Sequence, residues 1–302
     1  MSRKFTIGFL GATNPTVWGT FLAAFDKRLR KHGWVDGSNI AIVQQWAEGD
    51  PRKHAGLAKK LAAHGVDVIV TSGTQAVLAA MQEAKKTPIV FASAGDPVGA
   101  KLVKDLKRPG GYVTGLSNGQ TDLAHRRLDE LRRMVPDLKR LAILGNLGSK
   151  VIRLEIDQIK KWASSQHPRS ELVICDVRKP EQICPAIKQL GGKVGALYVC
   201  TDPFITTHRV AINIAAACAR LPTMHAFCEY VEAGGLMSYG PDFHAMFGRA
   251  ADIVDRILHG AKSKDIEVKV EKDCELVINK NTACALGLTI PDELRKRAKI
   301  IC

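Results

Sequence analysis

Short hydrophobic runs alternate with polar stretches of helical spacing along the first third of the chain. The runs are continuous and strand-sized, as expected of strands that are buried on both faces. The stretches between them are typical of amphipathic helices. This alternation predicts a parallel sheet covered by helices on both faces. The expected strands lie at residues 5–10, 40–43, 66–70 and 87–91, and the expected helices near 17–31, 52–64 and 74–85.

The same order of elements begins again after Leu116-Ser117. Leu141-Ala-Ile-Leu-Gly-Asn matches the first strand of the chain. Leu221-Pro-Thr-Met-His-Ala-Phe matches Thr87-Pro-Ile-Val-Phe-Ala-Ser, with proline at the same place before each strand. The simplest interpretation is that the chain contains two tandem copies of one structural unit, each with five strands. The alternative is a chance alignment of short apolar runs. The other matching strands lie at 172–175, 194–200 and 235–240.

Two segments remain after the second copy, a helix from about 242 to 259 and a strand–helix unit over 275–298. If the helix returns to the first lobe and the tail to the second, the chain crosses between lobes three times. The predicted fold class is α/β, with two doubly wound parallel-sheet lobes joined by a three-stranded hinge. The crossings would lie near 116–120, 239–242 and 265–274. Lobe 1 would comprise 1–117 and 241–268, and lobe 2 would comprise 118–240 and 269–302.

The formal net charge of +14 raises the question of nucleic-acid binding. The basic residues are, however, dispersed among acidic ones on expected helix faces, as at 26–31 and 125–133, and no nucleic-acid-binding motif accompanies them. We therefore interpret them as solvated helix surface, or as a field that favours anionic ligands or surfaces. Nucleic acid is not an expected partner.

No apolar run approaches the roughly 20 residues that a membrane-spanning helix needs. The first residues, Met1-Ser-Arg-Lys, lead into a strand without an apolar leader. This start indicates either a cytoplasmic protein or a mature or trimmed chain.

All eight cysteines fall in the second half of the chain, without C-x-x-C or metal-ligand spacing. Several lie in apolar contexts, so buried free thiols are expected. A disulfide such as Cys175 to Cys184 stays open. Unpaired thiols argue mildly against an oxidising compartment.

Three segments of the chain together resemble one protein family, and the resemblance extends over almost the whole chain. They are GDPVGAKLVKDLKRPGGYVTGLS at 95–117, SYGPDFHAMFGRAADIVDRILHGAK at 238–262 and ELVINKNTACALGLTIPDEL at 275–294. The resemblance is to the ABC-transporter substrate-binding protein family of the TrpX type. It implies a type I periplasmic-binding-protein fold, an ABC permease as partner, and a small solute such as an aromatic amino acid. It also implies a monomer that is periplasmic or membrane-tethered, with a cytoplasmic location as the alternative.

Ligands of such sheets bind beyond the carboxyl ends of the strands. An amino acid needs hydroxyls and backbone N–H groups for its carboxylate, an acid for its ammonium group and apolar walls for its side chain. In lobe 1 we expect Asp96 mainly to cap a helix that starts at Pro97, and Thr74 either to cap its helix or to contact the ligand. The lobe 1 candidates are Thr13, Asn14, Trp18, Ser72, Gly73, Thr74, Ser93, Ala94, Asp96 and Ser117.

In lobe 2, Asp202 is the best partner for an ammonium group, although Pro203 after it also favours a helix cap. Phe227, Glu229 and Tyr230 follow the fourth strand of this lobe, and Phe227 corresponds in the repeat to Ser93. Single aromatic residues on a helix or strand are more often core residues than ligand contacts. The lobe 2 candidates are Asn146, Thr201, Asp202, Phe227, Tyr230 and Tyr239, with Tyr198 as a further aromatic.

A catalytic function would need a constellation that the sequence lacks. There is no G-x-S-x-G, H-E-x-x-H or P-loop motif, and Gly8-Phe-Leu-Gly-Ala-Thr lacks dinucleotide-binding spacing. His225 is expected to be a core residue with its hydrogen bonds satisfied. We therefore expect no catalytic residue, metal or cofactor. A solute-binding protein is the leading hypothesis, ahead of a cytoplasmic ligand sensor and of a cleft enzyme.

Overall fold

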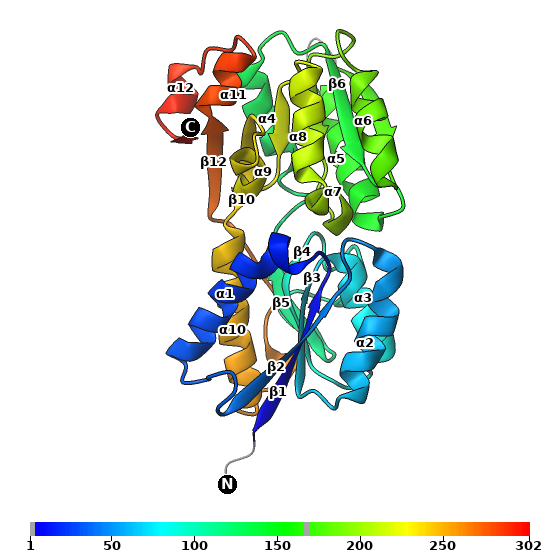
Figure 1. Cartoon of the computed structure of the whole chain (residues 1–302), viewed down its shortest axis with the longest axis vertical. Helices are drawn as coiled ribbons and strands as arrows, with labels where there is room; N and C mark the ends of the chain where they lie inside the picture. The colour runs from blue at the N-terminus through cyan, green and yellow to red at the C-terminus, as the bar shows by residue number, and fades with distance from the viewer. Residues whose placement is uncertain (1–3, 166–169) are drawn as a thin grey trace. The chain divides into compact units, whose positions relative to one another are not determined.

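The computed structural model describes residues 4–165 and 170–302, and the chain divides into two compact units (Figure 1). Unit 1 comprises Met1–Gly119 and Phe243–Glu271, and unit 2 comprises Gln120–Asp242 and Lys272–Cys302. The chain therefore passes from one unit to the other at three places along its sequence. Among the described residues, no helix is both long and apolar enough to cross a membrane.

Unit 1 is built on a six-stranded sheet in the order β11-β5-β4-β3-β1-β2, in which all neighbouring strands are parallel. Every residue of β3, β4 and β5 is buried, because helices cover both faces. The strands are β1 (Phe5–Gly11), β2 (Ile40–Trp46), β3 (Val68–Ser72), β4 (Ile89–Ala94), β5 (Val113–Ser117) and β11 (Lys269–Val270).

The helices α1 and α10 lie side by side on one face of this sheet, and α2 and α3 lie on the other (Figure 1). Phe21 of α1 stacks on Phe247 of α10 at 5.4 Å, and Phe247 also contacts Phe9 of β1. This aromatic core joins the last helix of the unit to its first strand. The helices are α1 (Pro15–Lys31), α2 (His54–Ala63), α3 (Thr74–Glu83) and α10 (Phe243–Leu258), with 3-10 turns η1 (Pro51–Lys53) and η2 (Ser263–Asp265).

Unit 2 is built on a seven-stranded sheet in the order β13-β12-β10-β9-β8-β6-β7. Only the pairing of β12 with β10 is antiparallel among the described strands. The order of its first five strands along the sheet repeats that of unit 1, which confirms the predicted duplication. The strands are β6 (Arg140–Gly145), β7 (Glu171–Asp176), β8 (Ala196–Val199), β9 (Thr223–His225), β10 (Met237–Pro241), β12 (Cys274–Asn279) and β13 (Lys299–Ile301).

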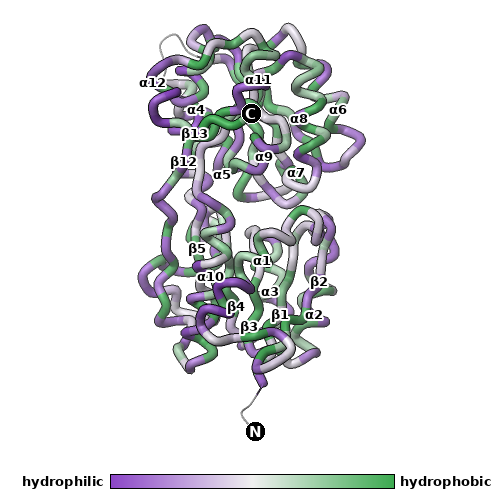
Figure 2. The backbone as a smooth tube through the Cα atoms, turned by 60° about the vertical axis from the view of Figure 1, so that its left-hand side comes forward, coloured by the Kyte–Doolittle hydropathy of each residue, from purple (hydrophilic) through white to green (hydrophobic). Residues whose placement is uncertain are grey.

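The helices around the second sheet are amphipathic, and the tube in Figure 2 alternates between hydrophobic and hydrophilic colours along α6. The apolar faces of the helices at 124–134 and 150–165 meet residues such as Ile143, Tyr198 and Met237 in one core. The helices are α4 (Ala124–Met134), α5 (Lys150–Ser165), α6 (Pro180–Lys188), α7 (Pro203–Thr207), α8 (Arg209–Cys218), α9 (Cys228–Glu232), α11 (Lys280–Ala285) and α12 (Asp292–Arg295).

All eight cysteines are free, so the structure contains no bond between Cys175 and Cys184. The expectation that the thiols are buried holds for Cys200 and is wrong for four others. In α6, for example, Ile183 and Ile187 face the core while Cys184 is exposed beside them. An apolar neighbourhood in sequence does not place a thiol on the buried face of a helix. The exposed cysteines are Cys184, Cys218, Cys284 and Cys302.

Gly115 of β5 offers a test of the packing between β5 and β4 in the first sheet. Its φ is +154°, and a Cβ atom there would lie 2.1 Å from the carbonyl oxygen of Phe91. We expect Gly115→Ala to lower the free energy of unfolding by about 2 kcal/mol, because both the backbone and β4 must shift. Urea unfolding followed by circular dichroism measures the change.

Gly248→Ala is the matched control for this substitution. Gly248 lies inside α10 with open space around the added methyl group. Alanine should raise the free energy of unfolding there by up to about 1 kcal/mol, since it has the higher helix propensity. Equal effects of the two substitutions would contradict the close approach of β5 and β4.

Candidate functional site

The carboxyl ends of β1, β3, β4 and β5 lie at one edge of the unit 1 sheet, because these strands are parallel. The ladder is irregular at this edge, with register shifts between Thr71 and Ser72 and between Phe91 and Ala94. We call this edge rim 1. It gathers nine of the predicted residues, namely Thr13, Asn14, Ser72, Gly73, Thr74, Ser93, Ala94, Asp96 and Ser117.

The turn between β1 and α1 and the first turn of α1 each hold a buried polar atom without a partner among the described residues. Asn14 caps α1, and its Oδ1 accepts a hydrogen bond from the Val17 amide at 2.9 Å. The hydroxyl of Thr13 and the indole N–H of Trp18 are both buried, and neither has a hydrogen-bond partner among the described residues. The Trp18 ring packs edge-on against Phe247 at 5.8 Å, as a core residue would. Buried polar groups are normally paired, so this turn retains hydrogen-bonding capacity.

The turn between β3 and α3 presents backbone N–H groups. Gly73, with φ of +87°, occupies the cap position of α3, and no side chain caps this helix. The prediction that Thr74 caps the helix is therefore wrong, because Thr74 is already its first residue. The Gly73 amide donates to the Ser93 carbonyl at 2.8 Å, which fixes this turn against β4. An uncapped helix N-terminus carries partial positive charge and favours an anion.

The loop after β4 is fixed by Asn118, which the sequence did not single out. Its side-chain amide donates to the Ser93 hydroxyl at 2.9 Å, and its backbone amide donates to the Ala94 carbonyl at 3.0 Å. Asp96 accepts from the Gly99 amide at 2.8 Å, so it does act as a cap. The predicted helix at Pro97 is wrong, since residues 97–101 form turns. Asp96 is thus occupied with its own loop.

Ser117 lies at the end of β5, the last strand of rim 1. Its hydroxyl accepts from the Gly119 amide at 3.3 Å and reaches the Gly95 carbonyl at 3.5 Å. These contacts join the end of β5 to the loop after β4. Ser117 therefore holds the rim together and has little capacity left for a ligand.

The corresponding edge of the unit 2 sheet, which we call rim 2, is centred on Asp202. The carboxylate accepts from the Ile205 amide at 2.8 Å, so Asp202 caps α7 as the alternative interpretation expected. A side-chain hydrogen bond also joins it to Asn146. Burial raises the pKa of Asp202 to about 6 in spite of these hydrogen bonds. The predicted residues of rim 2 are Asn146, Thr201, Asp202, Phe227, Tyr230 and Tyr239.

The aromatic residues of rim 2 differ in environment. Tyr230 is buried, shares a hydrogen bond of 2.8 Å with the Thr206 hydroxyl and stacks on His225 at 4.9 Å. Phe227 is buried directly before α9. The hydroxyl of Tyr239 is hydrogen-bonded to Arg126. Their contact with a ligand stays a prediction.

His225 is a core residue, as predicted, but its hydrogen bonds are not satisfied. Neither ring nitrogen has a partner among the described residues. Burial lowers the pKa of His225 to about 3, so the ring is neutral and packs as an aromatic group. A second acid of rim 2, Glu229, has a pKa of about 7, raised chiefly by burial.

A buried polar network lies directly behind rim 2, and the sequence analysis missed it. Arg127 is fully buried and donates to Glu155 at 3.3 Å and to the Tyr198 hydroxyl at 3.2 Å. The interpretation of 125–133 as solvated surface is therefore wrong at Arg127. The signal was its spacing, because Arg127 shares one helix face with Ala124, Leu128 and Leu131.

This network holds the backbone of rim 2 in place. The side-chain amide of Gln120 donates to Glu155 at 2.7 Å and to the Thr201 carbonyl at 2.9 Å. Arg127 also donates to the Gln120 carbonyl at 3.0 Å and to the Tyr239 carbonyl at 2.8 Å. Residue 120 is where the chain enters unit 2, and residue 239 lies three residues before the chain leaves it at Asp242. Burial raises the pKa of Glu155 although Arg127 faces it.

Within the described part of the chain, no three or more His, Cys, Asp or Glu side chains form a group that could hold a metal ion.

Comparison with known proteins identifies the family. A family model described as ABC transporter substrate binding protein matches residues 21–301. This chain belongs to that family. The tyrosine-binding protein of Clostridioides difficile (strain R20291) is 28% identical over 264 residues, which cover 87% of this chain and 75% of that protein.

Solved structures agree with this assignment. The crystal structure of an ABC domain in complex with L-Trp from Streptococcus pneumoniae is similar, with a TM-score of 0.91 and 28% identity over 99% of this chain and 100% of that chain. A solute-binding protein of Bacillus halodurans shares the fold at 14% identity and a TM-score of 0.64, over 95% of this chain and 99% of that chain. The predicted type I periplasmic-binding-protein fold is confirmed.

The buried Arg127–Glu155 pair yields a prediction about the stability of unit 2. Arg127→Met should lower the free energy of unfolding by about 3–5 kcal/mol, because Glu155 and two backbone carbonyls lose their buried donor. The double variant Arg127→Met/Glu155→Gln should recover part of this loss. Urea unfolding at pH 7 followed by circular dichroism measures both.

The control for this prediction is Arg140→Met, which removes a solvent-exposed pair with Glu171. Exposed ion pairs contribute little to stability, so this variant should unfold close to the wild type. A loss as small for Arg127→Met as for Arg140→Met would show that the buried pair is not required.

Proposed function

We propose that this chain is the solute-binding component of an ABC importer and that its solute is an aromatic amino acid. Membership of the substrate-binding family carries the first part of the proposal. The relative named as tyrosine-binding and the similar structure with L-Trp support the second part. The chemistry of the two rims fits such a solute, which carries one anionic group, one cationic group and one apolar body.

Rim 1 is proposed to bind the carboxylate. The uncapped N-terminus of α3 offers the backbone N–H group of Thr74, since that of Gly73 already donates to the Ser93 carbonyl. The Thr13 hydroxyl and the Trp18 indole N–H are buried donors without a partner among the described residues, and a carboxylate oxygen would satisfy them. Ser72 and Ser93 are engaged with each other, so they shape the site.

Rim 2 is proposed to bind the ammonium group and the side chain. Asp202 is its candidate acceptor, because an ammonium group would offset the cost of burying this carboxylate. Phe227 and Tyr230 are the candidate apolar walls. A solute bound by both rims would stabilise a closed state of the two units. The stabilisation would equal the difference between the free energies of binding to the closed and the open state.

We further propose that the protein works outside the cytoplasm as a monomer and delivers its solute to an ABC permease, as membership of the family suggests. It has no proposed catalytic role.

The function is tested by calorimetry and thermal shift with L-Trp and L-Tyr. Both should bind and raise the melting temperature, because they bind only the native state. Tryptamine lacks the carboxylate and indole-3-propionate lacks the ammonium group, so both should bind at least tenfold more weakly. L-Lys, which has no apolar end group, is the negative control. Failure of both aromatic amino acids to bind would exclude the proposed solute class.

The role of Asp202 predicts a pH dependence. Asp202 has a pKa of about 6 in the free protein, so below pH 6 it is protonated and cannot attract an ammonium group. The affinity for L-Trp should therefore fall about tenfold between pH 7.5 and 5.0. Asp202→Asn should bind L-Trp weakly with no such dependence, while asparagine still caps α7. Calorimetry at both pH values measures this.

Glu229→Gln is the matched control, since Glu229 also titrates near neutral pH. This variant should keep the pH dependence of the wild type. A wild-type affinity that is flat across this range, or a dependence that is lost in Glu229→Gln and kept in Asp202→Asn, would contradict the assignment of the ammonium group to Asp202.

A further inference from the structure

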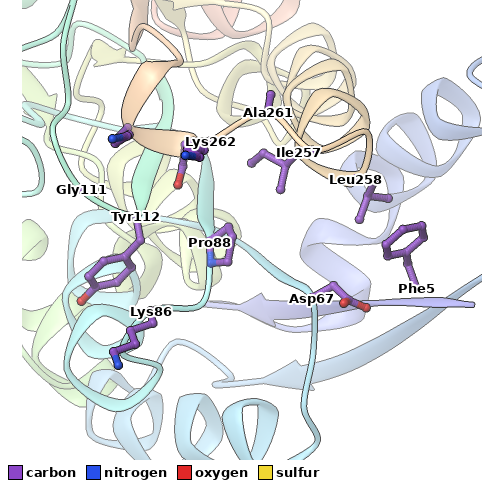
Figure 3. Close-up of a pocket in the computed structure, with 13 residues that line it drawn as sticks. Phe5, Asp67, Lys86, Pro88, Gly111, Tyr112, Ile257, Leu258, Ala261 and Lys262 are labelled. Atoms are coloured by element: carbon purple, nitrogen blue, oxygen red, sulfur yellow. The ribbon is translucent and has the colours of Figure 1, made fainter. Parts of the chain in front are cut away.

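Unit 1 contains a hollow at the end of its sheet opposite to rim 1. Figure 3 shows residues that line it. The amino ends of the parallel strands meet there. Phe5 begins β1, and Asp67, Pro88 and Tyr112 directly precede β3, β4 and β5. The remaining wall comes from the end of α10 and the residues after it, up to Lys264. We call this hollow the basal pocket. It shares no residue with rim 1.

The basal pocket has the size and the walls of a small-molecule site. Its volume is about 530 Å³, within the range of roughly 300–1,000 Å³ that such sites have. Figure 3 shows Phe5, Ile257 and Leu258 on one side of Pro88, and Tyr112 on the other. These side chains offer an apolar body a surface to pack against.

The charges that line the basal pocket are mainly positive. Lys86, Lys262 and Lys264 line it, and within the described residues none of the three is ion-paired with a carboxylate. Asp67 is the acid in the lining, and its carboxylate accepts a hydrogen bond from the Thr6 amide at 2.8 Å. Three ammonium groups against one carboxylate give the hollow a field that attracts anions.

The backbone conformation of Lys86 is unfavourable for a lysine. Its φ is +76°, in the left-handed region that glycine adopts easily and lysine does not. It lies in a turn that the Thr87 amide closes on the Ala84 carbonyl at 3.1 Å. A strained residue beside a pocket suggests a role for its side chain, since glycine would fit the backbone better.

We propose that the basal pocket binds a phosphate group attached to an apolar body. Three ammonium groups suit a phosphate better than a singly charged carboxylate, and lysine binds phosphate as a point charge. The strand ends and α10 would hold the apolar body. The same chemistry occurs in a soluble aryl or alkyl phosphate and in the headgroup region of an anionic phospholipid. This inference is independent of the proposed solute of the rims.

Calorimetry with phenyl phosphate at low ionic strength tests the site directly. The wild type should bind phenyl phosphate at least fivefold more tightly than inorganic phosphate, because only the former has an apolar body. The variant Lys86→Gly/Lys262→Gln/Lys264→Gln should lose at least tenfold in affinity for phenyl phosphate. Its urea midpoint should equal or exceed that of the wild type, since glycine relieves the strain at residue 86.

The matched control removes three lysine charges of unit 1 that lie outside the lining of the basal pocket, as Lys101→Gln/Lys104→Gln/Lys107→Gln. It should bind phenyl phosphate within twofold of the wild type. Equal losses in the two triple variants would show a general charge effect and overturn the site. Unchanged binding in the pocket variant would overturn it as well.

Vesicles distinguish the two sources of the phosphate group. Co-sedimentation with phosphatidylglycerol in phosphatidylcholine vesicles, lost in the pocket variant and kept in the control variant, would assign the site to a lipid headgroup. Binding of phenyl phosphate without co-sedimentation would assign it to a soluble phosphate ester. If neither probe binds to the wild type, the proposal is wrong.

Discussion

The parallel arrangement of the strands is the constraint on which the rest of this structure depends. When neighbouring strands run in one direction, their carboxyl ends meet at one edge of the sheet and their amino ends at the other. The backbone groups at each edge lose their ladder partners and must find others in the loops. In unit 1 this requirement produces rim 1 at one edge and the basal pocket at the other. One sheet therefore offers two chemically distinct surfaces.

The loops of rim 1 satisfy much of this requirement among themselves. Gly73 donates to Ser93, Asn118 donates to both Ser93 and Ala94, and Asp96 holds its own turn. Such contacts fix the positions of the few groups that remain unpaired. A site whose donors are held in place before the ligand arrives loses less conformational entropy on binding than a flexible one. The proposed binding of a carboxylate at rim 1 therefore depends on the few donors that stay unpaired, notably the Thr13 hydroxyl and the Trp18 indole N–H.

The elements of this fold could be predicted because burial on both faces leaves continuous apolar runs such as Ile89–Ala94. The duplication was visible because proline precedes the fourth strand in both halves. The conformation of the loops was harder to predict. Asp96 followed by Pro97 is typical of the start of a helix, but the same pair occurs as readily in a single turn. Arg127 was misinterpreted because charge was weighed more heavily than position. A buried arginine depends on Glu155 and Tyr198, which lie far away in the sequence and meet it only in the fold.

The buried network around Arg127 links the Thr201 loop of rim 2 to the chain segments at residues 120 and 239. Arg127 donates to the carbonyls of Gln120 and Tyr239, and Gln120 in turn donates to the carbonyl of Thr201, next to Asp202. The same side chains thus hold two segments next to the crossings and one loop of rim 2. A polar network of this kind has few alternative arrangements, because any shift that breaks one hydrogen bond leaves a buried polar or charged group without a partner. A displacement of the Thr201 loop would therefore be transmitted to the backbone at residues 120 and 239 and would not be absorbed by soft packing. The polar part of the core behind rim 2 thus connects the Thr201 loop to the two segments by hydrogen bonds, which fix positions more strictly than apolar contacts do.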